Sequence, residues 1–130
     1  MTKVKTNREL LKKVMNQAKS VCSKACKEDW NGTCAMCGKQ GTAAHHFFGW
    51  KICSNVRFNL DNLVWLCYSC HIHKVHQQGL TEPIRDAIVK RIGTARFKKL
   101  KDKSHLVKKY TVPEVNDIID EVKKRWNDAE

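Results

Sequence analysis

The chain has 130 residues, of which 42% are hydrophobic and 29% charged, a composition that suits one domain with a modest core and excludes long-range disorder. It contains no run of about 18 apolar residues, and its N-terminus lacks the apolar segment of a secretory signal. We therefore expect a cytoplasmic location. Lys and Arg number 25 against 13 Asp and Glu, and the net charge of +12 predicts a polyanionic partner, nucleic acid first and an anionic membrane second. Of these two we expect nucleic acid and no membrane partner.

The N-terminal part of the chain predicts a basic helix within residues 1–30. Residues 1–27 carry eight Lys or Arg and one acid. Thr6 and Glu9 have the spacing of a capping box, which marks the start of a helix. The apolar residues that follow recur at helical spacing and predict a stripe that packs in the core: Leu10, Val14, Ala18, Val21 and Ala25.

The centre of the chain, residues 31–80, holds most of the cysteines and histidines and few charges. Two short apolar runs at 43–48 and 62–66, bounded by Gly, Asn and Asp, predict two strands. Residues 68–78 then predict a helix that is closed by Gly79. The centre is therefore expected to contain two strands followed by a helix.

The C-terminal part, residues 81–130, predicts further helices. One spans 81–93, beginning at a Thr-Glu-Pro sequence and ending at a glycine. The overlapping segment 85–109 is strongly basic, with ten Lys or Arg and two acids. A second capping box at 111–114 begins the last helix. The fold class is therefore expected to be α+β, with the central unit packed among N- and C-terminal helices.

Four cysteines form two CxxC pairs, Cys34 with Cys37 and Cys67 with Cys70, with 29 residues between the pairs. Two residues between thiolates let one tight turn present both sulfurs to one ion, and two such turns complete the tetrahedral shell that zinc prefers. This spacing predicts a closed, structural Zn²⁺ site. Four unrelated buried thiols or redox CxxC motifs are the alternatives, and the cysteines of residues 22–26 offer a competing site with the first pair.

Five of the six histidines lie within residues 45–76, around the same cysteines. His45 and His46 are neighbours, so on a strand their side chains point to opposite sides and need different tasks. One can bind a metal while the other reaches a water beside it. His71 follows the second CxxC pair directly, so that zinc would fix its position. His76 lies five residues further on, a less regular spacing than a one-turn pair, and it completes the metal site or contacts phosphate.

The order CxxC, His-His, Asn-Leu, CxxC-His and a final His, over residues 34–76, resembles the HNH nucleases of the ββα-metal fold. A narrower resemblance extends to about residue 95. Arg57-Phe58, Asn62, the second CxxC pair and the segment 84–93 (IRDAIVKRIG) are similar to the phage Rap/NinG recombination nucleases, which cut branched DNA.

The resemblance implies a fold and a location. It implies a zinc-clamped ββα-metal (HNH) centre in residues 31–80, within one HNH nuclease domain that covers residues 1–130. For a phage-encoded protein, it implies the cytoplasm of the bacterial host.

The resemblance also implies a role for each polar residue of the centre. His46 would be the general base that activates water, which suits an imidazole whose ordinary pKa is near 6.5. His45 and His71, with or without His76, would hold one divalent ion. Asn62 would hold the loop and orient His46 through hydrogen bonding. Histidine ligands with open positions suit Mg²⁺ or Mn²⁺ in this role and also admit Ni²⁺ or Zn²⁺.

Residues around this centre are candidates for DNA contacts. Arginines suit bidentate phosphate contacts, lysines suit simple charge contacts, and an aromatic residue in a loop can either stack on an unpaired base or pack within the protein. No motif that reads base edges is present, which favours recognition of backbone and shape. The candidates are Arg57, Arg91, Arg96, Trp50, Lys51, Lys98 and Lys99.

The leading hypothesis is a metal-dependent DNA endonuclease that hydrolyses phosphodiester bonds, with branched or nicked DNA in phage recombination as its specific form. One alternative is a non-catalytic, zinc-containing module that binds nucleic acid, although binding alone requires neither the His-His pair nor Asn62. Another is a zinc scaffold for protein partners, which leaves the net charge unexplained. The residues leave open an RNA substrate and a homodimer.

Overall fold

The computed structural model describes residues 6–127. Helices dominate it, and its sheet consists of two strands. None of the helices in residues 6–127 combines the length and the apolar character needed to cross a membrane. In chain order the elements are α1 (Asn7–Asp29), β1 (Ala43–His46), the 3₁₀ turns η1 (Ser54–Val56) and η2 (Leu60–Asn62), β2 (Leu63–Leu66), the π-helical segment η3 (Cys70–Gln77), α2 (Glu82–Ile92), α3 (Thr94–Ser104) and α4 (Val112–Asn127).

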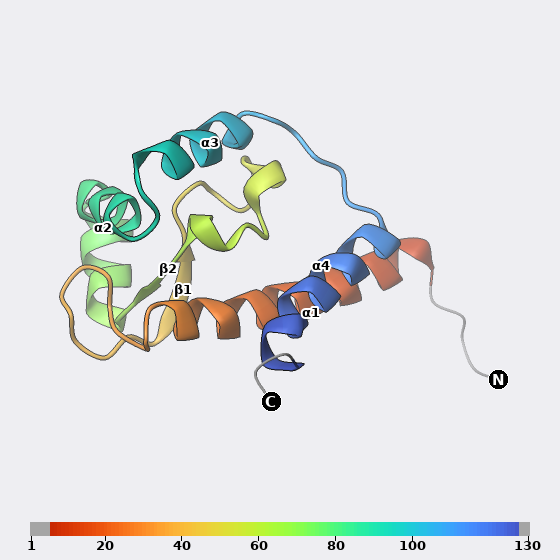
Figure 1. The fold of residues 1–130 in the computed structure, drawn as a ribbon, viewed down its shortest axis with the longest axis horizontal. Coiled ribbons are helices and arrows are strands. Elements are labelled where there is room, and N and C mark those ends of the chain that lie inside the picture. Colours follow the sequence, from red (N-terminus) through yellow and green to blue (C-terminus); the bar gives the residue numbers. More distant parts are fainter. Residues whose placement is uncertain (1–5, 128–130) are drawn as a thin grey trace.

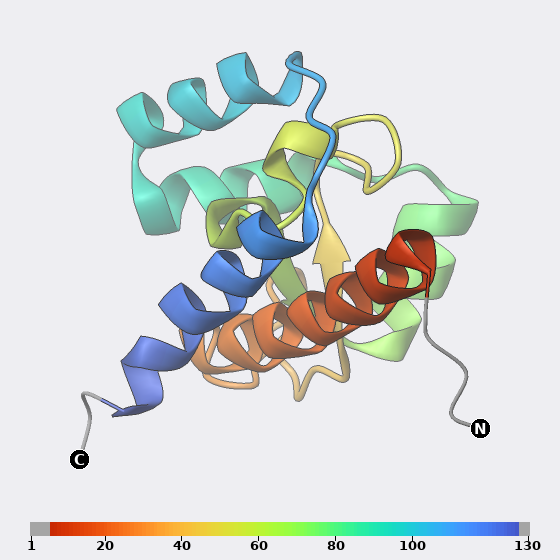
Figure 2. The same cartoon turned by 90° about the vertical axis from the view of Figure 1, so that its right-hand side faces the viewer.

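The two strands form an antiparallel hairpin in the middle of the molecule (Figure 1). Ala43 lies opposite Leu66, and His46 lies opposite Leu63. Helix α1 crosses one face of the hairpin, with α4 packed against α1, and α2 and α3 lie on the other side (Figure 1 and Figure 2). Because both faces are covered, all four residues of β2 are buried.

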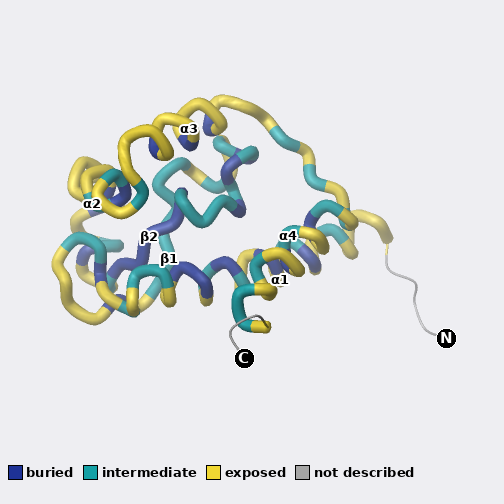
Figure 3. Tube along the Cα trace, in the orientation of Figure 1, coloured by how far each residue is buried: buried dark blue, intermediate teal, exposed yellow. Residues whose placement is uncertain are grey.

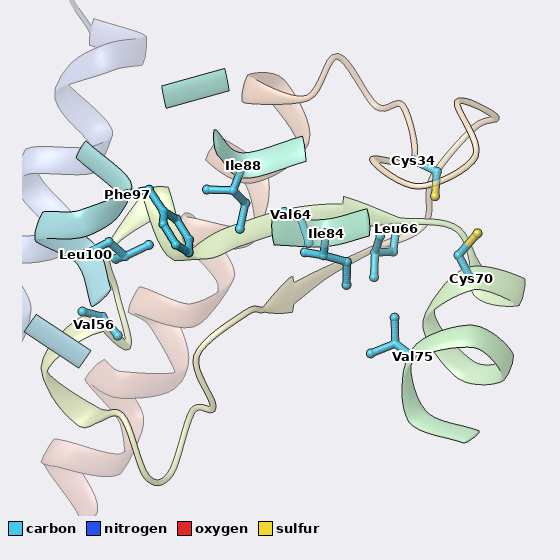
Figure 4. Close-up of a cluster of buried hydrophobic side chains, with 10 residues drawn as sticks. All are labelled: Cys34, Val56, Val64, Leu66, Cys70, Val75, Ile84, Ile88, Phe97 and Leu100. Carbon is cyan, nitrogen blue, oxygen red and sulfur yellow. The ribbon is translucent and has the colours of Figure 1, made fainter. Parts of the chain in front are cut away.

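One core lies between the hairpin and the helices α2 and α3. Val64 and Leu66 contribute to it from β2, and the side of α3 that faces inward is buried while the outer side is exposed (Figure 3). Figure 4 shows how these side chains converge and how the core continues into the cysteine-bearing segments. Its buried members are Cys34, Val56, Val64, Leu66, Cys70, Val75, Ile84, Ile88, Phe97 and Leu100.

The second core lies on the opposite face of the hairpin. Leu63 and Trp65 alternate with the β2 residues of the first core and pack against α1 and α4. The C-terminal end of α1 is tied to two other helices by Asp29. Its carboxylate pairs with Arg91 of α2 at 3.3 Å and with Arg125 of α4 at 3.1 Å. The hairpin is therefore held from both faces on one helical frame.

Most of the predicted elements are present, with shifted bounds. Both capping boxes begin helices, since the backbone N–H groups of Glu9 and Glu114 donate to the hydroxyls of Thr6 and Thr111. The strands are shorter than predicted, at four residues each. Of the stripe predicted for the first helix, Leu10 is 39% exposed and does not join the core. The predicted span of that helix includes residues 1–5, which lie outside the described residues.

The helix α3 was not predicted as an element, because its sequence shows charge rather than periodicity. Only Phe97, Leu100 and Ser104 are buried in it. Gly93, with a φ of +88°, ends α2 and immediately precedes α3. The glycine that predicted the end of one helix is also the sharp turn into the next.

Candidate functional site

The four predicted cysteines lie together at the end of the hairpin, in agreement with the predicted cluster. The Sγ atoms of Cys34, Cys37, Cys67 and Cys70 all lie within 4.8 Å of one another. A tight turn presents the first pair, closed by the Gly38 N–H that donates to the Cys34 carbonyl at 3.0 Å. The second pair joins β2 to η3, and Figure 4 shows the sulfurs of Cys34 and Cys70 facing the same space.

The spacing of these sulfurs fits a zinc ion. Zn–S bonds of about 2.3 Å in a tetrahedron place the sulfurs about 3.8 Å apart. The Sγ atoms of Cys37 and Cys67 are 3.7 Å apart. The Cys70 backbone N–H also donates to the Cys67 Sγ at 3.4 Å, an arrangement that stabilises a thiolate. The donor set is thus suited to a closed, structural Zn²⁺ site.

The thiols of this cluster differ in acidity. Burial raises the pKa of Cys34, but backbone hydrogen bonds from Cys67, Cys37 and Met36 offset it and bring that pKa down to about 7. Burial and the neighbouring thiols raise the pKa of Cys70 to about 12. The Cys34 thiolate therefore forms readily while Cys70 resists ionisation, and a bound cation would favour the thiolate form of both.

The competing site with Cys22 and Cys26 is not formed by the described residues. Both side chains are buried in α1, within the core shared with α4. Burial raises the pKa of Cys22 to about 11 and that of Cys26 to about 12. They are therefore apolar packing residues of the helix.

The second cluster consists of His45, His71 and His76, each with a ring nitrogen within 4.8 Å of the others. His45 comes from β1, and the other two come from η3. The Nε2 atoms of His71 and His76 are 3.0 Å apart, and the ring centroid of His45 is 5.1 Å from that of His71. We call these three residues the histidine triad.

The helix type explains how His76 reaches the triad. In a π-helix the hydrogen bonds run from residue i to i+5, so residues five apart lie side by side. His71 and His76 have this spacing within η3. An α-helix would place them on different sides. The spacing that looked irregular in the sequence is therefore the regular one for this segment.

The protonation state of the triad suits the binding of a cation. Burial, followed by the neighbouring histidines, lowers the pKa of His45 from 6.5 to about 4. Burial and His76 also lower the pKa of His71. Both rings are therefore neutral at pH 7, with lone pairs available to a metal. Since His76 is exposed, the triad has an open side, as a catalytic metal site requires.

His46 points to the opposite side of β1 and is held by a backbone carbonyl. Its Nε2 lies 2.9 Å from the carbonyl oxygen of Arg57. A carbonyl only accepts, so the neutral ring carries its proton on Nε2 and keeps Nδ1 free to accept one. Burial, followed by the charges of Lys19 and Arg57, lowers the pKa of His46, although the hydrogen bond to Arg57 opposes this shift.

The side chain of Asn62 bonds to the loop that follows β1, but it does not bond to His46. Its side chain is fully buried, accepts the Phe48 N–H at 2.7 Å and donates to the carbonyls of Phe48 and Val56. Val56 directly precedes Arg57, whose carbonyl accepts the hydrogen bond from His46. Asn62 is therefore connected to His46 only through the backbone of Val56 and Arg57.

The residues predicted to contact nucleic acid differ in their availability. Arg91 and Arg96 are engaged in ion pairs within the protein, with Asp29 and Asp61 respectively. The ring of Trp50 packs against His46, at a centroid distance of 5.0 Å. The structure therefore favours the packing alternative for Trp50. Among the other candidates, which have no ion pair in residues 6–127, Lys51, Lys98 and Lys99 are exposed and Arg57 is half-buried.

One residue that lies close to His46 and Trp50 was not among the predicted site residues. Lys19 of α1 reaches the loop after β1, where its Nζ lies 5.1 Å from the centroid of Trp50. Its sequence position showed only that it belongs to a basic, amphipathic helix. No local pattern relates it to a loop some thirty residues away.

Comparison with protein families gives a match that covers the whole chain. A family model described as "Bacteriophage Lambda NinG protein" matches residues 1–130. Comparison with curated proteins gives no match. Comparison with solved structures gives none either. The resemblance to phage NinG proteins, first indicated by the central motifs, thus extends over the full length. The chain belongs to the bacteriophage lambda NinG family.

Proposed function

We propose that the chain is a metal-dependent DNA endonuclease of the HNH (ββα-metal) type. One observation carries the proposal. Three histidine nitrogens suited to one cation are grouped at β1, and the next residue of the same strand is a fourth histidine, whose ring is held by a backbone carbonyl. Binding nucleic acid requires no such pair of functions. Hydrolysis of a phosphodiester requires both, a cation at the phosphate and a base for the water.

In the proposed reaction, His46 accepts a proton from water through Nδ1, while the Arg57 carbonyl holds the Nε2–H and prevents the ring from turning. The hydroxide attacks the phosphorus, and the bond from phosphorus to the 3′ oxygen breaks. A divalent ion held by His45, His71 and His76 would polarise the phosphate and stabilise the leaving oxygen. Mg²⁺ or Mn²⁺ suits this task, and Ni²⁺ or Zn²⁺ also binds imidazole.

The cysteine cluster supports the same reaction without taking part in it. A closed four-sulfur shell has no position for substrate. It joins the end of β2 to η3, and η3 carries two members of the triad. In the proposed function, structural Zn²⁺ therefore fixes the distance between His71 and His45.

DNA is the proposed partner because of the charge. The net charge is +12, and the outer side of α3 carries exposed lysines that include Lys98 and Lys99. We place the reaction in phage recombination on branched or nicked DNA, in the host cytoplasm, as an activity of residues 1–130 acting as one domain. A homodimer would allow the two strands of a symmetric junction to be cut by two sites.

A cleavage assay tests this proposal. Linear duplex, nicked duplex, flap and four-way junction DNA would each be incubated with Mg²⁺, with Mn²⁺ or with excess EDTA. We expect cutting that depends on the added ion, with the branched or nicked substrates cut fastest. Tight binding without cutting under any ion would contradict the proposal and favour the alternative, a non-catalytic zinc module that binds nucleic acid.

A further inference from the structure

Two cations are gathered around one aromatic ring beside His46. The guanidinium of Arg57 lies 4.8 Å from the centroid of Trp50, and its Nε donates to the Trp50 carbonyl at 2.9 Å. Lys19 approaches the same ring from α1, with Nζ at 5.1 Å. The ring of His46 meets Trp50 edge-on, at 5.0 Å. Residues from a helix and from a loop thus place two positive charges next to the candidate base.

These two charges lack acidic partners within residues 6–127, and what distinguishes them is that both lie over one aromatic ring. No ion pair of Lys19 or Arg57 occurs in that part of the chain. Both cations lie over the Trp50 ring, and Arg57 also lies over the Tyr110 ring, at 5.8 Å. Two like charges beside one ring, without acidic partners, favour the binding of an anion near them. The cations that do have acidic partners are Arg85, Arg91, Arg96, Arg125, Lys108 and Lys124.

A small cleft lies at this point between α1 and the hairpin. Lys19, His46, Trp50 and Arg57 contribute to its lining, and the rest of its wall is mostly apolar and includes Phe58 and Leu63. Lys19 is exposed and Arg57 half-buried, so one cation reaches outward while the other is fixed by its hydrogen bond to Trp50. The cleft lies on the His46 side of β1, whereas the histidine triad lies on the other side of the strand. An anion held here is therefore separate from one held at the triad.

We propose that Lys19, Trp50 and Arg57 form a phosphate-binding subsite, which holds a DNA backbone phosphate next to the one that is cut. This inference rests on the proposed nuclease function and extends it. Trp50 then acts by positioning two cations, instead of stacking on a base. Helix α1 becomes part of the substrate site, because it supplies Lys19 from outside the ββα centre.

The first test measures DNA affinity against salt concentration, without added divalent ion. We expect Lys19→Met to weaken binding about threefold to tenfold, and to reduce the slope of log affinity against log salt by about 0.9, the value of one phosphate contact. Met keeps the length of the alkyl chain and the helix propensity. Lys19→Arg keeps the charge, and we expect it to retain the wild-type slope.

Lys24→Met is the matched control. Lys24 is an exposed lysine of the same helix, and its Nζ also lies over a tryptophan, 4.5 Å from the centroid of Trp126 on α4. The Lys24→Met variant removes one lysine charge and one contact between a lysine and a tryptophan ring, as Lys19→Met does, but at a different place on α1. Equal slopes for the two Met variants would overturn the subsite, because the effect would then come from net charge alone.

The second test locates the phosphate. One methylphosphonate, which is uncharged, would be placed in turn at each position around a mapped cut site. We expect wild-type protein to lose cleavage rate at one flanking position, and Lys19→Met to show no further loss there. The same loss in both proteins would overturn the subsite and leave the nuclease proposal intact. Absence of wild-type cleavage would overturn the nuclease function and, with it, this placement of the phosphate.

Discussion

Replacing Cys67 with Ser should unfold the protein or lower its stability severely. The four sulfurs lie within 4.8 Å of one another, at the junction between β2 and η3. Structural zinc contributes about 10–16 kcal/mol in small zinc-binding peptides, whereas whole domains are stable by only about 5–15 kcal/mol. The free energy of zinc binding that the loss of one ligand puts at stake is therefore as large as the free energy of unfolding of a whole domain. The measurements are zinc content by mass spectrometry and thermal unfolding by circular dichroism.

Cys53→Ser is the control for that result. Cys53 is half-buried, and it lies outside the cysteine cluster. Its replacement should leave the zinc content at one ion per chain and lower the melting temperature slightly. Unchanged zinc content and an unchanged melting temperature in the Cys67 variant would refute the four-cysteine site.

Replacing His46 with Ala should reduce DNA cleavage by about 10²- to 10⁴-fold, the usual contribution of a general base. The variant loses the Nδ1 acceptor, but the triad, the cysteine cluster and the surface lysines remain. Folding and DNA affinity should therefore be close to wild type. The lowered pKa of His46 means that the ring is neutral at pH 7, and the wild-type rate should fall only when the pH drops below 6.5.

His73→Ala is the matched control for the His46 variant. His73 is an exposed histidine of η3 that contacts Gln77 at 3.2 Å and does not belong to the triad. Its cleavage rate should stay within about twofold of wild type. If His46→Ala retained the wild-type rate under the same conditions, His46 would not be the base.

Residues whose sequence spacing indicates binding to one common metal ion were predictable from the sequence. The two CxxC pairs and the adjacent His45 and His46 follow rules of turn and strand geometry, and the structure brings the cysteines together as expected. His76 was harder to place, because its spacing fits a π-helix and sequence patterns assume an α-helix. The helix type was the missing piece of information.

Residues that depend on contacts between distant segments were not predictable. Arg91 and Arg96 are of a residue type that commonly binds DNA phosphates. In the structure, however, Arg91 pairs with Asp29 and Arg96 pairs with Asp61, and both acids are far away in the chain. Trp50 could be assigned to packing only once its neighbours were known. Lys19 had no distinguishing pattern, since its part in the site comes from the packing of α1 against the hairpin.

The most direct test of the nuclease proposal is a titration of zinc-loaded protein with Mn²⁺, in which bound ion and cleavage rate are followed together. We predict one Mn²⁺ per chain beyond the cysteine-bound zinc, with cleavage rising in proportion to its occupancy. His71→Ala should keep the zinc and lose both the bound Mn²⁺ and the cleavage. Full cleavage by His71→Ala, or by wild-type protein with no divalent ion at the triad, would contradict the account.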